Sequence, residues 1–217
     1  MKILNLYAGI GGNRKLWSSD HKITAIELNP EIAKVYQEFF PYDTVIVGDA
    51  HQYLLEHYKE FDFIWASPPC PSHSRIRKMG AQKNLYPAIY PDFALWQEVT
   101  LLQHFHENKW IIENVVPYYT PIIEASFKLD RHCFWSNIVV PYKKFKPREK
   151  SHKDINGGND TIFGINLSKY NIKDKRRLLR NMVNPELGKH ILDCALNTKK
   201  KKEKMTFKLE QPRTGLI

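Results

Sequence analysis

The chain has 217 residues, 42% of them hydrophobic, which suits one globular domain with a buried core and includes no apolar run near the ~18 residues that a membrane span requires. Its cysteines, Cys70, Cys133 and Cys194, lie far apart, so they form neither a C-x-x-C zinc motif nor a disulfide framework, and a reducing, cytoplasmic setting is expected. The formal net charge of +10 is uneven, because residues 1–140 hold 13 Lys+Arg against 15 Asp+Glu, whereas residues 141–217 hold 20 against 8.

Three apolar segments of strand length open the chain, each followed by a turn and a predicted helix. The strands are expected at Lys2–Leu6, Lys22–Ile26 and Thr44–Val47, and the helices at about Asn13–Trp17, Pro30–Phe39 and Asp49–Tyr58. Because the first strand follows Met1 directly, without a small-residue cleavage site, no signal peptide is expected.

The turns after these strands carry glycines and carboxylates. The motif Tyr7-Ala8-Gly9-Ile10-Gly11-Gly12 lets the backbone turn sharply, lets a ligand approach closely and leaves helix N–H groups facing an anion. Glu27, at the end of the second strand, is placed either to bind ribose hydroxyls or as a plain surface carboxylate. Asp49, after the third strand, can cap the next helix, accept a hydrogen bond from an adenine amino group, or do both.

The most informative stretch runs from Phe61 to Ser74. It begins as an apolar strand and ends in Pro68 and Pro69, which cannot continue a central strand and which restrict the loop. Cys70 follows directly, so a thiol is held beyond the carboxyl end of a buried strand, where α/β sheets bind ligands. The alternative is a small buried hydrophobe, the usual state of a free cysteine.

The rest of the chain continues the alternation of strands and helices, which predicts an α/β fold with a doubly wound, mostly parallel sheet. Glu113 follows a strand on the same sheet edge as Cys70. Beyond Thr198 a poorly ordered tail is expected. The remaining expected segments are a mobile loop at Arg75–Tyr90, a helix at Asp92–His106, strands at Trp110–Ile112 and Ile138–Val140, a loop or small appendage from 141 to about 160, and a helix at Pro185–Leu196.

The basic C-terminal third favours contact with a polyanion. Tyr142 and Phe145 interleave with cations there, as in a surface that contacts nucleic-acid phosphates. The run Lys199–Lys202 is equally well explained as a solubilising tail. The cations of the expected surface are Lys143, Lys144, Lys146, Arg148, Lys150, Arg176 and Arg177.

The order of these motifs resembles the DNA cytosine-5 methyltransferase family over most of the chain. The resemblance implies a Rossmann-like, S-adenosylmethionine-dependent methyltransferase fold with a small basic appendage. The matching segments, in the family's order, are the glycine motif, Glu27, Asp49, the nucleophile motif Pro69-Cys70-x-x-x-Ser74, the glutamate motif Glu113-Asn114-Val115, the arginine motif at Arg131 and the closing motif Asn181-x-Val183.

The resemblance implies catalytic roles for three residues. Cys70, as its thiolate, adds to C6 of cytosine and activates C5 for methyl transfer. Glu113 binds the N3 edge of the base and stabilises the charge that develops there, and Arg131 holds the O2 carbonyl. The base leaves the helix stack to reach this pocket. The implied cofactor is S-adenosylmethionine, which becomes S-adenosylhomocysteine, and no metal is implied.

The implied cofactor site draws on residues from both ends of the chain. The glycine turn holds the methionine end, Tyr7 the adenine face, Glu27 the ribose and Asp49 the adenine amino group. The full set is Tyr7, Ala8, Gly9, Gly11, Gly12, Glu27, Leu28, Asp49, Ala50, Pro69, Asn181 and Val183.

The chain departs from the family's pattern at Pro71, Cys133 and Arg180, where Gln, a second arginine and Gly are usual. The expected domains are a catalytic core at 1–140, a reduced target-recognition region at 141–180, the closing motif with a returning helix at 181–198, and a basic tail at 199–217. So short a recognition region is similar to compact, phage-type members. It implies double-stranded DNA as partner, in a bacterium or phage-infected host with a restriction-modification context, and leaves room for a partner chain that supplies sequence recognition.

Two alternatives remain open at this point. The run Ser67-Pro68-Pro69-Cys70 is similar to the tRNA-methylating branch of the family, although that branch's Cys-Phe-Thr signature is absent. The departures at Pro71, Cys133 and Arg180 also suit a module that binds nucleic acid without turnover.

Overall fold

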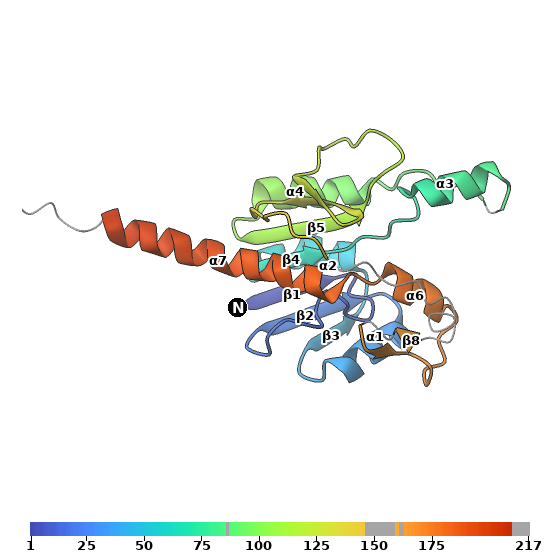
Figure 1. Ribbon diagram of the computed structural model, residues 1–217, viewed down its shortest axis with the longest axis horizontal. Helices are drawn as coiled ribbons and strands as arrows, with labels where there is room; N and C mark the ends of the chain where they lie inside the picture. The colour runs from blue at the N-terminus through green and yellow to red at the C-terminus, as the bar shows by residue number, and fades with distance from the viewer. Residues whose placement is uncertain (86, 146–158, 161–162, 210–217) are drawn as a thin grey trace, which may run out of the picture.

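The computed structural model describes residues 1–85, 87–145, 159, 160 and 163–209, and for 159, 160 and 198–209 it describes the backbone alone. A seven-stranded sheet in the order β3-β2-β1-β4-β5-β7-β6 forms its centre (Figure 1). The pairs among β1 to β5 are parallel, and β7 pairs antiparallel with β5 and with β6. The strands are β1 (Lys2–Leu6), β2 (Lys22–Glu27), β3 (Thr44–Val47), β4 (Phe63–Ala66), β5 (Lys109–Val115), β6 (Phe127–Leu129) and β7 (His132–Ser136), with a separate pair β8 (Asn159–Asp160) and β9 (Ile165–Asn166).

Helices cover both faces of the sheet, so the doubly wound prediction is confirmed. On one face Leu4 and Leu6 of β1 pack against α2 and α4; on the other, Ile3 packs in the cluster that includes α7. α1 covers the second face at β2 and β3. The α-helices are α1 (Pro30–Phe39), α2 (Ala50–His57), α3 (Arg75–Gln82), α4 (Ala94–Phe105), α6 (Lys175–Asn181) and α7 (Pro185–Leu209), and η1 (Tyr58–Glu60) is a 3-10 turn. In the described part of the chain, none of these is long and apolar enough to cross a membrane.

A buried polar network supports the loop that follows β1. Asn13 Nδ2 donates to Asn5 Oδ1 at 2.8 Å, and the Tyr36 hydroxyl donates to Asp43 Oδ2 at 2.9 Å. Arg14 binds both oxygens of Asp43, at 2.8 and 3.1 Å, so the buried guanidinium is paired and bidentate. These bonds hold Asn13, beyond the glycine motif, against β1 and Arg14 against the segment that follows α1.

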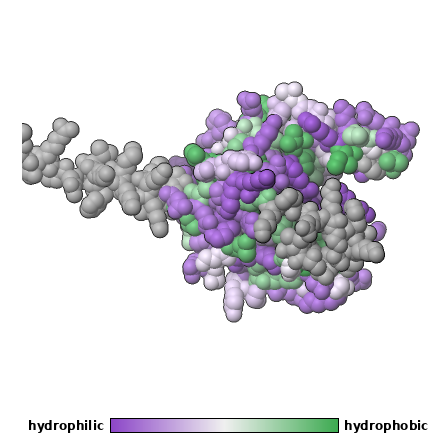
Figure 2. Space-filling view, in the orientation of Figure 1, coloured by the Kyte–Doolittle hydropathy of each residue, from purple (hydrophilic) through white to green (hydrophobic). Residues whose placement is uncertain are grey.

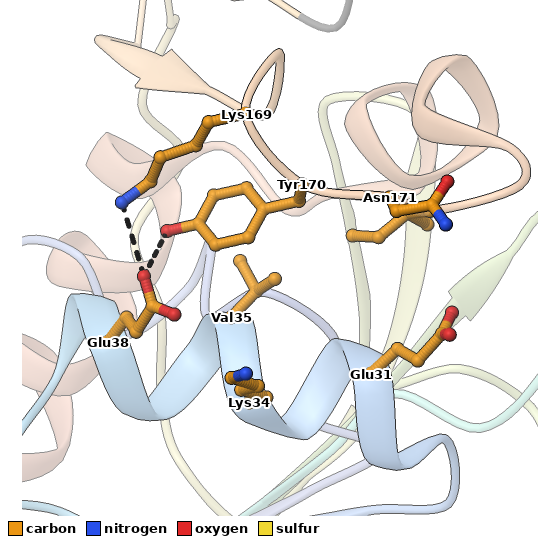
Figure 3. A pocket seen from close by; sticks show the side chains of 8 residues that line it. Glu31, Lys34, Val35, Glu38, Lys169, Tyr170 and Asn171 are labelled. Atoms are coloured by element: carbon orange, nitrogen blue, oxygen red, sulfur yellow. Dashed lines mark hydrogen bonds and ion pairs between the residues drawn. The ribbon is translucent and has the colours of Figure 1, made fainter.

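The segment 163–172 lies across α1 and leads into α6. Glu38 of α1 accepts hydrogen bonds from the Tyr170 hydroxyl at 2.8 Å and from Lys169 Nζ at 3.2 Å. Figure 3 shows both side chains pointing down to the Glu38 carboxylate. All three side chains line a cavity of about 360 Å³. Beneath them, Ile165 and Leu167 are buried with Val35, so this segment packs onto α1 through apolar side chains as well as through hydrogen bonds.

Several predicted elements differ from the observed ones. Residues 13–17 form turns rather than a helix, and residues 75–82 form α3 rather than a loop. Ile138–Val140 is not a strand; the strand is β7, which ends at Ser136. The helix predicted at Pro185–Leu196 continues as α7 to Leu209, into residues expected to be a poorly ordered tail. Glu113 lies within β5 rather than after it. β6, β8, β9 and α6 had no counterpart among the predicted elements.

α3 extends away from the sheet as an arm (Figure 1). It carries exposed apolar side chains, Ile76 and Met79, among cations. Figure 2 shows green patches on this arm within a largely hydrophilic face. With so few apolar residues and no regular period, residues 75–82 show little sequence signal for a helix.

The start of α7 is packed tightly against the turn after β1, and this predicts a local stability effect. A Cβ on Gly188 would lie 2.3 Å from the backbone oxygen of Asn13. Gly188→Ala should therefore lower the free energy of unfolding by about 1–3 kcal/mol, the usual cost of overpacking, in urea denaturation. Gly48→Ala is the matched control, because a Cβ there meets nothing within 4 Å. Equal stability of the two variants would contradict this packing.

Candidate active site

The predicted site residues lie at one edge of the sheet because the strands that precede them are parallel. Leu6, Ile26 and Ala66 are paired at the carboxyl ends of β1, β2 and β4, and Glu27 is paired with Val47 of β3. The strand order reverses between β1 and β4, which makes this edge the point where open α/β sheets bind ligands.

The glycine motif forms a turn with left-handed backbone conformations, and it is crowded at Gly11 and Gly12. Tyr7, Gly9 and Gly11 have positive φ values of 55°, 53° and 75°. A Cβ on Gly12 would lie 2.1 Å from Met182 Cγ and 2.6 Å from the Val183 carbonyl oxygen. The closing motif thus returns to the glycine loop, so the structure brings together these two predicted parts of the site.

The two predicted cofactor acids are held in place by backbone N–H groups. Glu27 Oε2 accepts from Gly9 N and Oε1 from Asn29 N, both at 2.9 Å, and each oxygen keeps a second lone pair for a ligand. Asp49 Oδ1 caps α2 by accepting from His51 N and Gln52 N, at 2.8 and 3.1 Å, so the predicted capping role is confirmed.

The neighbouring residues complete a cradle that suits S-adenosylmethionine. Leu28 is 70% exposed beside Glu27 and offers an apolar surface to a flat ring. Ala8 and Ala50 are buried and can contribute backbone groups only, while Pro69 and Asn181 are exposed. The glycine turn matches the methionine part of that cofactor. The two ordered carboxylates and the exposed apolar side chain match its ribose and adenine parts.

Sequence reasoning missed Glu98 of α4, which is fully buried beside this cradle. The Tyr7 hydroxyl donates to Glu98 Oε1 at 2.5 Å, and His51 Nδ1 lies 2.9 Å from the same oxygen. Burial and the nearby carboxylate raise the pKa of Tyr7 well above its ordinary value, so Tyr7 stays protonated and donates. A single acid in an amphipathic helix gives no sequence signal for this role.

Cys70 is carried by a loop that is fastened to the neighbouring strand. Asn114 Nδ2 donates to the Pro68 carbonyl oxygen at 3.1 Å, and the Cys70 carbonyl accepts from His73 N at 3.1 Å. The Cys70 side chain is partly exposed. Burial and the negative charge of Glu113 raise the pKa of its thiol, whereas Arg131 acts in the opposite direction. Glu113 and Arg131, the other two predicted catalytic residues, are therefore both within electrostatic reach of Cys70.

The strand pairing decides which side chains accompany Glu113. Because β7 pairs antiparallel with β5, with Phe134 opposite Glu113, His132 lies on Glu113's face and Cys133 on the other. His132 Nε2 is 3.2 Å from Glu113 Oε1, and both residues are 93% buried, while Cys133 packs in the core cluster beneath α4.

Arg131 occupies the two-residue turn between β6 and β7, where Asp130 has a φ of 54°. It is exposed, and its Nη2 donates to the carbonyl oxygen of Arg180 at 2.6 Å. The sequence offered no signal that His132 would contact Glu113 or that Arg131 would bind the backbone of α6.

A cavity of about 500 Å³ opens beside Cys70, a volume in the range of ligand pockets. Its walls come from the Cys70 loop and α3 on one side and from α6 and its preceding turn on the other. The lining residues are Cys70, Pro71, Ser74, Ile76, Arg77, Asp174, Arg176, Arg177, Arg180 and Asn181. Of the predicted phosphate-contacting cations, Lys146, Arg148 and Lys150 fall outside the described residues, and within those residues no group of His, Cys, Asp and Glu side chains is arranged to hold a metal.

The sheet and its ligand edge define the Rossmann-like fold of S-adenosylmethionine-dependent methyltransferases. The family model of C-5 cytosine-specific DNA methylases matches residues 1–116, more than half of the chain. The chain belongs to this family.

Individual relatives also match over part of the chain. A human tRNA (cytosine(38)-C(5))-methyltransferase is 30% identical over 86 residues, which cover 37% of this chain and 22% of that enzyme. A solved mutant of DNMT2 from Spodoptera frugiperda is 27% identical, with a TM-score of 0.37, over 52% of this chain and 35% of that one. A methyltransferase from Agrobacterium tumefaciens is 12% identical, with a TM-score of 0.41, over 55% and 40%. The matches thus span about a fifth to two fifths of these relatives' lengths.

The influence of Glu113 on Cys70 predicts a measurable change in thiol reactivity. Glu113→Gln removes the negative charge that helps raise the Cys70 pKa, so the thiolate forms at lower pH. The pH profile of Cys70 alkylation by iodoacetamide, followed by peptide mass spectrometry, should shift to lower pH. Glu124→Gln, which neutralises an exposed carboxylate, is the control, and Cys194 is an internal reference. An unchanged Cys70 profile in Glu113→Gln would show that the carboxylate does not act on the thiol.

Proposed function

We propose that this protein transfers a methyl group from S-adenosylmethionine to C5 of cytosine in DNA through a covalent bond between Cys70 and C6. The observation that carries the proposal is the position of Cys70. It lies beyond β4 at the edge that holds the glycine loop, within electrostatic reach of Glu113 and open to a cavity of about 500 Å³. Membership of the C-5 cytosine-specific family supports the reaction type.

The proposed reaction uses the chain's residues as follows. The Cys70 thiolate forms a bond to C6, and the electron pair displaced from the C5–C6 double bond makes C5 nucleophilic. Bound S-adenosylmethionine would supply an electrophilic methyl group, which C5 takes as the methyl–sulfur bond breaks and S-adenosylhomocysteine is left. Glu113 binds the N3 edge and stabilises charge as it shifts onto the ring. Water removes the C5 proton, the S–C6 bond breaks, and Cys70 leaves again as thiolate.

His132 is a positioning residue in this scheme. Its Nε2 contacts one oxygen of Glu113, which leaves the other oxygen for the base. Its Nδ1 is buried and has no hydrogen-bond partner within the described residues, which suits a group that completes its bonding when substrate or water enters. Arg131, tied to Arg180, acts on the site as a fixed positive charge.

A second candidate substrate is tRNA. The 30% identity to a human tRNA cytosine-5 methyltransferase and the Ser67-Pro68-Pro69-Cys70 run favour it. Cys70 chemistry on C6 is the same for both nucleic acids, so the active site alone does not decide between them. A partner chain that supplies sequence recognition remains compatible with either substrate.

The first test is methyl transfer from labelled S-adenosylmethionine to mixed-sequence duplex DNA and, in parallel, to tRNA. Wild type should form 5-methylcytosine in DNA, and Cys70→Ala should form none, because no thiolate remains to activate C5. Digestion to nucleosides followed by mass spectrometry identifies the product. Greater methyl transfer to tRNA than to DNA would identify tRNA as the substrate. Activity in Cys70→Ala would exclude the covalent route, and binding of cofactor and DNA without transfer would favour a non-catalytic module.

The positioning role of His132 predicts graded losses. Gln carries an amide nitrogen that can replace Nε2, so His132→Gln should keep more activity than His132→Leu, which should lower kcat by roughly 10- to 100-fold. KM for S-adenosylmethionine should be unchanged, and His104→Gln, at an exposed position, is the control. Equal kcat in the Gln and Leu variants would mean that His132 only fills space.

A further inference from the structure

The short helix α6 faces the cavity beside Cys70 with a concentrated positive charge. Arg176, Arg177 and Arg180 all line that cavity, and Arg77 of α3 lines the opposite wall. Asp174 is the single acid among the lining residues. The nucleophile is therefore reached through an opening whose walls carry four arginines.

α6 is fixed in place rather than loosely attached. Leu179 is fully buried, and Met182, directly after the helix, packs with Ile10 of the glycine motif. The Arg180 carbonyl accepts from Arg131 Nη2 at 2.6 Å. The segment before α6 is held to α1 through Glu38 (Figure 3). The arginine side chains thus start from a backbone whose distance from Cys70 is set by the core.

Arg176 and Arg180 have no acidic partner in the described part of the chain, whereas Arg177 is paired with Asp174. Asp174 caps α6 by accepting from Arg177 N at 3.0 Å, and its other oxygen lies 3.5 Å from Arg177 Nε. No carboxylate of the described residues forms an ion pair with Arg176 or Arg180. These two are spaced i,i+4 on an exposed helix face, where like charges are mutually destabilising by a few tenths of a kcal/mol. An anion between them would relieve this repulsion.

We propose that α6 binds the phosphodiester backbone flanking the nucleotide whose base enters the Cys70 cavity, with Arg176 and Arg180 as the phosphate ligands. This inference rests on the proposed function for the identity of that nucleotide. Guanidinium groups match phosphate oxygens in geometry and charge. A base taken out of its stack brings its own two phosphates to the mouth of the pocket, where these side chains lie. Phosphates are common to DNA and RNA, so α6 binds either backbone and provides no sequence reading.

The equilibrium test compares Arg176→Gln/Arg180→Gln with the control Lys22→Gln/Lys59→Gln, which removes two exposed cations elsewhere on the chain. The probe is a short fluorescent DNA duplex of mixed sequence, titrated over a range of salt, with a tRNA titrated in parallel. The arginine variant should lower the slope of log Kd against log salt by about 2 and weaken binding on the order of tenfold at low salt. The lysine control should leave both nearly unchanged. S-adenosylmethionine affinity, measured by calorimetry, should match wild type in every variant, which shows that the fold is intact.

A second experiment localises the phosphate contacts. A single 5-fluorocytosine in the duplex defines which base lies at Cys70, because fluorine cannot leave as the C5 proton does and the covalent adduct persists. Methylphosphonates, which are neutral, replace either the two phosphates flanking that base or two phosphates several nucleotides away. In a double-mutant cycle, replacing the flanking phosphates should abolish the loss of binding affinity that Arg176→Gln/Arg180→Gln causes. Replacing the distant phosphates should leave that loss of affinity unchanged.

The outcomes separate this inference from the proposed function. If wild type forms the adduct but the arginine and lysine variants behave alike, or the cycle is additive at the flanking phosphates, the α6 assignment is wrong and the reaction stands. If wild type forms no adduct with DNA or tRNA yet the arginine variant still loses salt-dependent binding, the reaction is wrong and α6 remains a phosphate-binding element. If neither adduct nor arginine-dependent binding is found, both are overturned.

Discussion

The close contact of Gly12 with Met182 and Val183 determines how the two ends of the chain form one site. There is no room for a side chain at Gly12, because the Val183 carbonyl and the Met182 side chain occupy the position of a Cβ. This contact fixes the glycine loop on the cofactor side and holds the end of α6 opposite Cys70. The cofactor cradle and the arginine-lined opening therefore depend on the same few atoms, and movement at Gly12 would displace both.

The sequence predicted those elements whose signals are local. α1 was predicted at its observed bounds because Pro30 suits the first turn of a helix, and the alternation of strands with helices predicted the parallel sheet and the edge that its strands share. α3 and α6 were missed because their sequences are dominated by charged and polar residues. Such short helices are set by caps at Ser74 and Asp174 and by contacts with distant segments, which a single sequence does not display.

Motif spacing placed the catalytic residues in sequence but did not determine where their side chains face. Counting two positions from Arg131 leads to Cys133, yet strand alternation turns Cys133 into the core and presents His132 to Glu113. The presence of Cys133 where the family usually has a second arginine therefore says little about the pocket that would hold the base. The partner of Glu113 became visible only once the register between β5 and β7 was known, because pairing across strands depends on long-range structure.

The electrostatics around Cys70 favour formation of the thiolate only when the substrate base is bound. In the protein alone, burial and the Glu113 carboxylate raise the pKa of the thiol, so the neutral form persists and resists oxidation. In the proposed complex, Glu113 forms a hydrogen bond with the base. This bond weakens the effect by which its negative charge opposes thiolate formation at Cys70. Arg131, held in place by Arg180, remains as the charge that favours the thiolate. Entry of cytosine would thus shift Cys70 toward its reactive form at the moment that C6 comes within its reach.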